Sequence, residues 1–220
     1  KGRSFLTMLG IIIGVTAVLV ALVSGYNADI TAYYEKLGVN KVNVTVTWYD
    51  TSRSVDVMSA LYDYCDQELS DMVEGVSPDL STALPMKYRT TILDSSTVYL
   101  GSDEYAVCNN YTLAGGREMS YLDVEKTNAV CVLGAGAKEA LFDFTDPVGE
   151  YITINGQPFK VVGYYEAVDL EGWNELDNII VLPYTFNRSM NNNYNIDSYV
   201  VKAKSAQATV EAMTKLDAFL

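Results

Sequence analysis

The sequence predicts an α+β protein, in which an N-terminal transmembrane and stalk helix precedes a mixed α+β extracytoplasmic domain of two lobes. Three features lead to this prediction. The chain opens on a long apolar run, short strand-like segments follow it, and helical segments occur among them without the regular alternation of a doubly wound sheet. We expect a transmembrane helix over residues 1–25, a helical stalk over 26–38 and the domain over 39–220.

The apolar run, FLTMLGIIIGVTAVLVALV at residues 5–23, contains no charged side chain. A helix of this length rises about 28 Å, close to the thickness of the hydrocarbon core of a bilayer. Lys1 and Arg3 precede it, and no basic residue follows before Lys36. The positive-inside rule therefore places the N-terminus in the cytoplasm and the rest of the chain outside. A cleaved signal peptide is the alternative.

Gly10 and Gly14 form a GxxxG motif within this run. Such spacing lets a second helix approach closely, so we expect a helix-packing site here. The alternative is that these glycines have no special role, because glycine is common in membrane helices.

The segment after the membrane predicts a stalk. Tyr26, Ile30, Tyr33 and Leu37 recur at helical spacing on one face, and Gly38 then supplies a C-terminal stop.

The domain begins with a predicted strand at 41–48 and a loop at 51–58. Asp66 is expected to cap a short helix that presents Leu69 on its apolar face and ends at Gly75. Apolar alternation or continuous apolar runs predict further strands at 79–92, 97–108 (with a turn at 101–103), 128–133, 178–182 and 198–203.

Residues 147–166, PVGEYITINGQPFKVVGYYE, predict a β-hairpin that turns at Asn155-Gly156. In the register of a two-residue turn Pro158 faces Thr153. Proline has no N–H to donate on the other side, so this end of the second strand should be an edge. The side chains expected to be buried are Ile152, Ile154, Phe159 and Val161.

Three helices complete the prediction. AKEALFDF forms a helix that ends before Pro147, residues 184–190 form a short helix, and residues 191–195 form a polar loop. Ser205 is expected to cap a last helix with Val210, Met213 and Leu216 on one side; it runs to Leu220, beyond which we expect the chain to continue. We expect the domain to form two lobes, one of about residues 39–94 with 196–220 and an inserted β-rich lobe of about residues 95–195.

The charge balance argues against nucleic acid as a partner. The chain has 15 Lys and Arg against 28 Asp and Glu, a net charge of −13. Such a chain is repelled by phosphate backbones and anionic lipid surfaces. It suits a solvated extracytoplasmic domain or a partner with basic patches.

The residues indicate no catalytic site, no cofactor and no metal. The chain has no histidine, which excludes Ser-His and Cys-His nucleophiles and histidine-based zinc sites. It has no P-loop, and Gly134-Ala135-Gly136 is better explained as a strand-to-helix turn than as a phosphate loop. The acidic run 169–177 does not match the ligand order of an EF-hand. We therefore predict that this chain is not an enzyme.

The three cysteines, Cys65, Cys108 and Cys131, are far apart in sequence. One disulfide is compatible with this count, but three buried thiols that pack as small apolar side chains explain it better.

Segments along nearly the whole chain resemble, in order, the MacB/FtsX-type permease family of ABC transporters. They are FLTMLGIIIGV (5–15), LGVNKVNV (37–44), LAGGREMSYLDVEKTNAVCVLG (113–134), ALFDFTDPVGEYITINGQPFKVVGYYE (140–166) and NIIVLPYTFNRSM (178–190). The residues that match its motifs, expected to be structural, are Gly38, Asn40, Gly116, Arg117, Asp123, Gly134, Pro147, Gly149, Asn155, Gly156, Gly163 and Pro183. Phe142-Asp143 departs from the Phe-Gly that the family tends to have.

The resemblance implies a permease subunit in the cell membrane that forms a homo- or heterodimer and pairs with a cytoplasmic ABC ATPase. It also implies three further transmembrane helices, an extracytoplasmic adaptor as a further partner, and export of a peptide, lipoprotein or drug. The competing hypothesis is a single-pass adhesin or sensor ectodomain that binds a protein or peptide. That class explains the acidity and the missing catalytic residues, but not the ordered matches.

Overall fold

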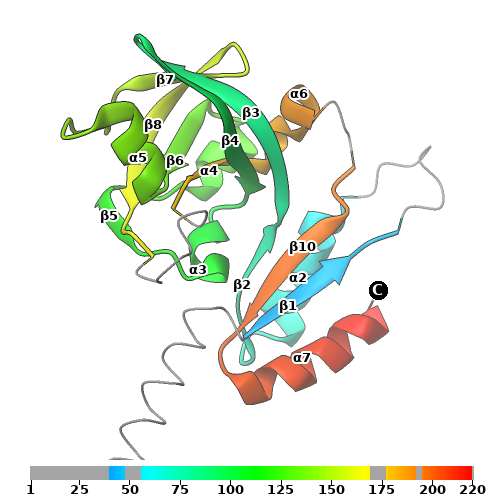
Figure 1. Ribbon diagram of the computed structural model, residues 1–220. Helices are drawn as coiled ribbons and strands as arrows, with labels where there is room; N and C mark the ends of the chain where they lie inside the picture. The colour runs from blue at the N-terminus through cyan, green and yellow to red at the C-terminus, as the bar shows by residue number, and fades with distance from the viewer. Residues whose placement is uncertain (1–39, 48–55, 169–176, 192–194, 220) are drawn as a thin grey trace, which may run out of the picture. The chain divides into compact units, whose positions relative to one another are not determined.

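The computed structural model describes residues 40–47, 56–168, 177–191 and 195–219. These residues belong to one compact unit, Asn40–Leu220, with two sheets (Figure 1). The predicted transmembrane and stalk helices, with Gly10, Gly14 and Gly38, lie outside the described residues. Among the helices that are described, none is both long and apolar enough to cross a bilayer.

The smaller sheet has three antiparallel strands in the order β1-β10-β2. Two helices, α2 and α7, pack on its apolar face, where Val42, Leu61 and Val201 are buried. A stack of Tyr64 on Phe219, with ring centroids 4.2 Å apart, joins the two helices. The bounds of these elements are β1 Lys41–Thr45, α2 Val57–Glu68, β2 Val73–Pro78, β10 Ser198–Ala203 and α7 Ala206–Phe219.

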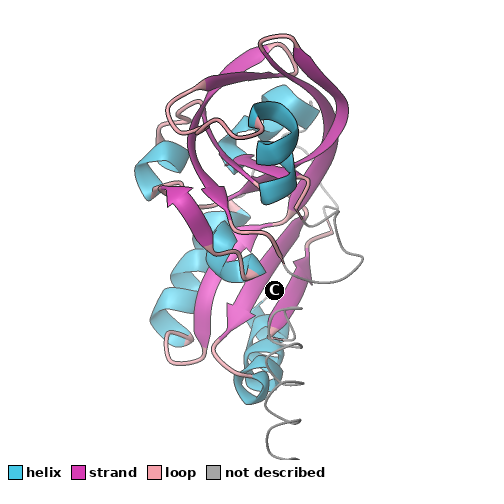
Figure 2. Ribbon diagram, turned by 60° about the vertical axis from the view of Figure 1, so that its left-hand side comes forward, coloured by secondary structure: helices cyan, strands magenta, loops and turns pink. Residues whose placement is uncertain are grey.

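The larger sheet has seven strands in the order β5-β8-β6-β9-β4-β3-β7. Because β7 also pairs with β8, the sheet closes on itself, and its strands curve round in Figure 2. The strands are β3 Leu80–Tyr88, β4 Thr91–Gly101, β5 Leu113–Gly116, β6 Val130–Leu133, β7 Tyr151–Ile154, β8 Gln157–Tyr165 and β9 Ile179–Pro183. The helices among them are α3 Tyr105–Asn109, α4 Tyr121–Glu125, α5 Ala135–Phe142, η2 Tyr184–Phe186 and α6 Asn187–Asn191.

The hairpin prediction is confirmed. Asn155 and Gly156 form the turn with φ angles of 47° and 81°, and Thr153 faces Pro158. The four side chains expected inside, Ile152, Ile154, Phe159 and Val161, are all 0% exposed. On the far side of β8, the pairing with β6 begins only at Lys160, so Pro158 lies at an edge as predicted.

The predicted helix from Asp66 to Gly75 is wrong. Helix α2 begins at Val57, capped by Asp56, and residues 73–78 form β2 instead. The correct helical stripe is Met58, Leu61 and Cys65, which are buried against the smaller sheet. Helix α2 therefore begins inside the segment 51–58, which was expected to be a loop.

The predicted turn at 101–103 between two strands is also wrong, because α3 follows β4 there. The reason is a close contact: a Cβ on Gly101 would lie 2.4 Å from the ring of Tyr105. Glycine at this point leaves room for the Tyr105 side chain at the end of β4, where the chain turns into α3.

The predicted face of the last helix needs correction. Ser205 does lie at the start of α7, where its hydroxyl accepts a hydrogen bond from the Ala208 N–H at 3.1 Å. The buried pair is Ala212 and Leu216, whereas Val210 and Met213 are 64% and 53% exposed. The predicted burial of Leu216 is confirmed, but the small Ala212 side chain faces the sheet beside it in place of Val210 and Met213.

We propose that the domain divides into lobes at the connection between β2 and β3. The small lobe then contains the three-stranded sheet with α2 and α7, and the large lobe contains the closed sheet. Residues 79–94 were expected in the first lobe, but β3 lies in this range and pairs with β4 and β7 of the larger sheet. The predicted boundary therefore moves to residue 79.

Candidate functional site: the junction of the two sheets

The two sheets are joined by a buried hydrogen-bond network between β2 and the turn after β4. The Ser102 N–H donates to Ser77 Oγ at 3.0 Å, and the Ser102 hydroxyl donates to the Val76 carbonyl at 2.9 Å. Ser77 and Ser102 are 0% and 2% exposed. Buried hydroxyls with partners on both sides hold two elements in one arrangement, because leaving them unpaired costs free energy.

Glu104, which precedes α3, extends this network. Its carboxylate accepts a hydrogen bond from the Val76 N–H at 2.7 Å. A Cβ on the neighbouring Gly75 would lie 3.4 Å from both Glu104 and Cys108 Sγ, so α3 packs closely against this part of β2. Helix α3 is thus held against β2.

Two lysines contact the other end of α3. Lys41 and Lys202 face each other across β1 and β10, and their amines donate to Asn109 and Asn110, with 2.9 Å between Lys41 Nζ and Asn109 Oδ1. Burial lowers the pKa of Lys41; the carboxylate of Asp79 opposes this and Lys202 adds to it. The C-terminal end of a helix favours positive charge, which explains cations at this position.

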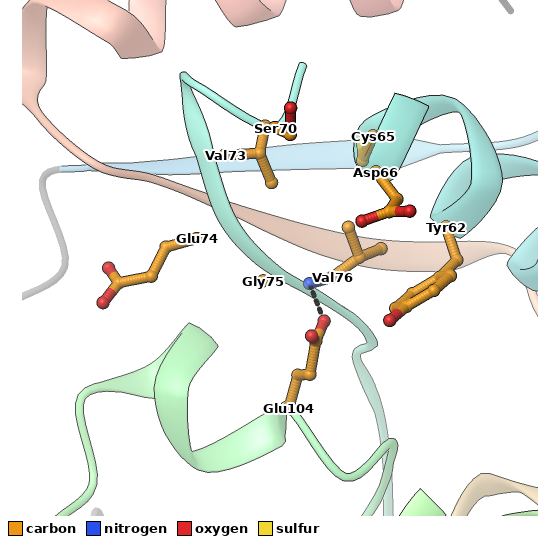
Figure 3. Close-up of a pocket in the computed structure, with 9 residues that line it drawn as sticks. All are labelled: Tyr62, Cys65, Asp66, Ser70, Val73, Glu74, Gly75, Val76 and Glu104. Carbon is orange, nitrogen blue, oxygen red and sulfur yellow. Dashed lines mark hydrogen bonds between the residues drawn. The ribbon is translucent and has the colours of Figure 1, made fainter. Parts of the chain in front are cut away.

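A cavity of about 110 Å³ opens beside the junction (Figure 3). Its lining residues are Tyr62, Cys65, Asp66, Ser70, Val73, Glu74, Gly75, Val76 and Glu104, which include no Lys or Arg. Burial raises the pKa of Glu104; the Val76 N–H opposes the shift, and Asp103 and Asp66 add to it. The cavity is acidic and small.

The polar groups of this junction are engaged in hydrogen bonds that join the two sheets. No group of three or more His, Cys, Asp or Glu side chains that could hold a metal occurs among the described residues. The three cysteines are buried and free, as expected, and burial raises the pKa of Cys65 to about 12. Thiols with such pKa values remain protonated at neutral pH and are poor nucleophiles.

Of the motif residues, the structure brings Arg117 and Asp123 together. Arg117 donates to both carboxylate oxygens of Asp123, at 2.6 and 3.4 Å. Ser120 and Asn128 also donate to this carboxylate, and Ser120 and Asp123 form a capping box at the start of α4. The cluster fixes the connection between β5 and β6.

Two motif glycines allow close backbone approach beside this cluster. A Cβ on Gly116 would lie 2.3 Å from the Val162 carbonyl, and one on Gly163 would lie 2.4 Å from the Arg117 carbonyl. Gly116 also has a φ of 78°, which disfavours other residues.

The remaining motif residues lie at turns and at the ends of elements, and the structure does not bring them into one site. The Asn40 carbonyl accepts from the Ala203 N–H, and Gly134 caps α5 next to the Asp177 carbonyl. Pro147 and Gly149 form the turn before β7, and Pro183 ends β9. The hairpin turn is formed by Asn155 and Gly156.

The junction residues were not predicted from the sequence; they are Ser77, Ser102, Glu104, Lys41 and Lys202. A weak signal was present: Ser77 interrupts an apolar strand, and Lys41 begins one. Nothing in the spacing of these residues indicates that they meet, because they come from segments far apart along the chain.

The family described as the MacB-like periplasmic core domain matches residues 4–219, almost the entire chain. The chain belongs to this family. The ordered motif matches in the sequence, including those around the Arg117–Asp123 cluster and the hairpin, are thereby confirmed as family resemblance. The description of this family is that of a periplasmic core domain, which agrees with the absence of a P-loop motif from the sequence.

Curated relatives include a macrolide export ATP-binding/permease protein, MacB 2, from Aeromonas hydrophila, which is 28% identical over 97% of this chain. A MacB of the same description from Vibrio parahaemolyticus is 30% identical over 83% of this chain. The match covers 35% and 28% of these relatives, so the chain spans about a third of their length.

Solved structures share the fold. The periplasmic region of MacB from Actinobacillus actinomycetemcomitans superposes with a TM-score of 0.62 at 21% identity, covering 81% of this chain and 83% of that one. The extracellular domain of the ABC-type transporter YknZ from Gram-positive bacteria gives 0.59 at 15% identity, with 79% and 88% covered. The mixed α+β domain predicted from the sequence is confirmed.

Proposed function

We propose that this chain is the extracytoplasmic part of a permease subunit that couples ATP hydrolysis in the cytoplasm to export outside the membrane. It lies in the cell membrane through a retained helix at 5–23, with the domain on the outer side. The partners are a cytoplasmic ABC ATPase, a second permease subunit and an extracytoplasmic adaptor; the substrate class is a peptide, lipoprotein or drug.

The observation that carries this proposal is the family match over residues 4–219, which includes the predicted membrane helix. The junction supports it. Motion delivered to the small lobe reaches the large lobe only if the two are held together, and the Ser77–Ser102 network and α3 join them through buried hydrogen bonds.

The predicted stalk is the element that delivers the motion. A continuous helix through residues 26–37 transmits a displacement of a few ångströms as a rigid body, whereas a flexible segment absorbs it.

The test is to insert a flexible Gly-Ser segment at Asn27 of the full permease, reconstituted with its ATPase. We expect ATP hydrolysis to continue and export to fall by at least tenfold. Insertion of a helical seven-residue segment at the same position is the matched control, since seven residues nearly preserve the helix phase. Unchanged export with the Gly-Ser insertion contradicts the lever mechanism.

A further inference from the structure

The outward face of the larger sheet carries a patch of apolar and basic side chains on β4, β3, β7 and β8. The strand register places Ile92 opposite Lys87, Lys87 opposite Thr153, and Thr153 opposite Pro158. The next row along the same face places Tyr151 opposite Lys160. We call these six residues the basic sheet face; β3 and β7, which carry part of it, lie side by side in Figure 1.

This face is open to solvent. Ile92 is 56% exposed and Tyr151 is 62% exposed, and Lys87, Pro158 and Lys160 are exposed as well. The alternate residues on the same strands, such as Met86, Ile154 and Phe159, fill the core. The period of two therefore directs the alternate side chains of these strand segments outward.

The lysines here do not serve to protect a sheet edge. Natural proteins place lysine on edge strands to prevent pairing with other chains. However, β3 is paired on both sides, with β4 and β7, and β7 is paired with β3 and β8. The exposed apolar side chains between the lysines also add no protection against association.

The charge of this face is opposite to that of the chain, whose net charge is −13. Neither Lys87 nor Lys160 forms an ion pair with any described side chain. The neighbouring carboxylate of Glu150 lies 3.9 Å from the guanidinium of Arg89, a third cation beside the patch. Lys87 and Lys160 are two strands and one row of this face apart, roughly 12 Å at the usual strand spacing and rise per residue.

We propose that the basic sheet face is a docking surface for a partner protein whose segment presents carboxylates on either side of an apolar or aromatic side chain. The two lysines pair with the carboxylates, and Ile92, Tyr151 and Pro158 cover the apolar group. Charge complementarity selects this occupant, since two unpaired cations about 12 Å apart flank exposed apolar surface. The proposal concerns a different surface from the junction and does not depend on the export function.

The test uses the full chain in a neutral detergent and a fluorescein-labelled peptide, Glu-Glu-Phe-Glu-Tyr-Glu-Glu, with binding followed by fluorescence anisotropy. We expect saturable binding that weakens as salt rises. The same peptide with Gln in place of Glu should bind at least tenfold more weakly. The Lys87→Glu/Lys160→Glu variant should lose at least tenfold in affinity, and Tyr151→Ser should lose several-fold.

The matched control is Lys126→Glu/Lys204→Glu, which changes the net charge identically at exposed sites elsewhere. Retained binding in this variant supports the assignment, and an equal loss in both double variants overturns it, because net charge alone would then explain the binding. Two other results also overturn it. One is binding of the chain to phosphatidylglycerol vesicles through these lysines without binding of the peptide, and the other is self-association of the chain that the Lys87→Glu/Lys160→Glu variant abolishes. Circular dichroism of each variant verifies that it is folded.

Discussion

Asp123 shows how much one buried carboxylate can organise. It accepts hydrogen bonds from Arg117, Ser120 and Asn128, while its own side chain is 6% exposed. Burial alone would raise the pKa of this carboxyl, but the hydrogen bonds from Arg117 and Ser120 outweigh burial and hold the pKa well below its usual range. The ionised form is therefore part of the folded structure.

We expect Asp123→Asn to lower the free energy of unfolding by about 2 kcal/mol at pH 7, the usual worth of hydrogen bonds to a charged group. Because the pKa is lowered on folding, the contribution of the wild-type carboxylate is complete above its unfolded pKa of about 4 and is lost as the pH falls further. Urea denaturation of both proteins between pH 7 and 3 measures this. Asp63→Asn, at an exposed site on α2, is the control; a difference between wild type and Asp123→Asn that does not shrink at low pH contradicts the prediction.

At the scale of elements, α2 shows why a helix boundary can be misplaced. Both Asp56 and Asp66 are followed by apolar residues at helical spacing. Asp56 is the cap, since its carboxylate accepts from the Ser59 N–H at 3.1 Å and from the Ser59 hydroxyl at 2.6 Å. Asp66 lies inside the helix, where its side chain faces the cavity of Figure 3.

Asp56→Ala should therefore destabilise the protein by about 1 kcal/mol through loss of the N-cap. Asp56→Asn keeps an acceptor oxygen and should retain most of the stability. Asp66→Ala is the decisive comparison, because it should have little effect if Asp66 is no cap. Thermal unfolding followed by circular dichroism measures all three, and a larger loss for Asp66→Ala than for Asp56→Ala would contradict the assignment.

For the molecule as a whole, the junction joins the two sheets through buried hydrogen bonds. The strands of each sheet are held by their own ladders, but β2 contacts the larger sheet through few groups, among which Ser77, Ser102 and Glu104 are buried or half-buried. Removal of the Ser102 hydroxyl leaves the Val76 carbonyl without this hydrogen-bond donor.

We expect Ser102→Ala to lower the free energy of unfolding by about 1–3 kcal/mol, the cost of leaving buried polar groups unpaired. Amide hydrogen exchange should increase in β2 more than in β6, which lies in the core of the larger sheet. Ser96→Ala is the matched control: Ser96 is a buried serine whose hydroxyl makes no hydrogen bond among the described residues, so its loss should be neutral or stabilising. Equal effects of the two variants would show that the junction network does not hold the sheets.

The predictability of the fold differs between its local and non-local parts. The hairpin was predicted to the residue, because a two-residue turn sets the register and the period of two sets the buried face. Buried strands such as β6 and β9 follow from continuous apolar runs. In contrast, the apolar face of α7 was predicted from its largest side chains, whereas the structure buries Ala212. Which side of α7 is buried depends on how closely the helix packs against the small sheet, and the sequence of the helix does not contain this information.

The sequence by itself determined the class of the domain, most of its strands and the family to which it belongs, because alternation, turns and motif order are local properties. Only the tertiary structure decided the closure of the larger sheet through β7 and β8, the transfer of β3 to that sheet and the junction. The physical reason is sequence separation. Ser77 meets Ser102, and Lys202 meets Asn110, across stretches of chain with no periodicity that relates them. Such contacts are selected by the packing of complete elements, which no local pattern encodes.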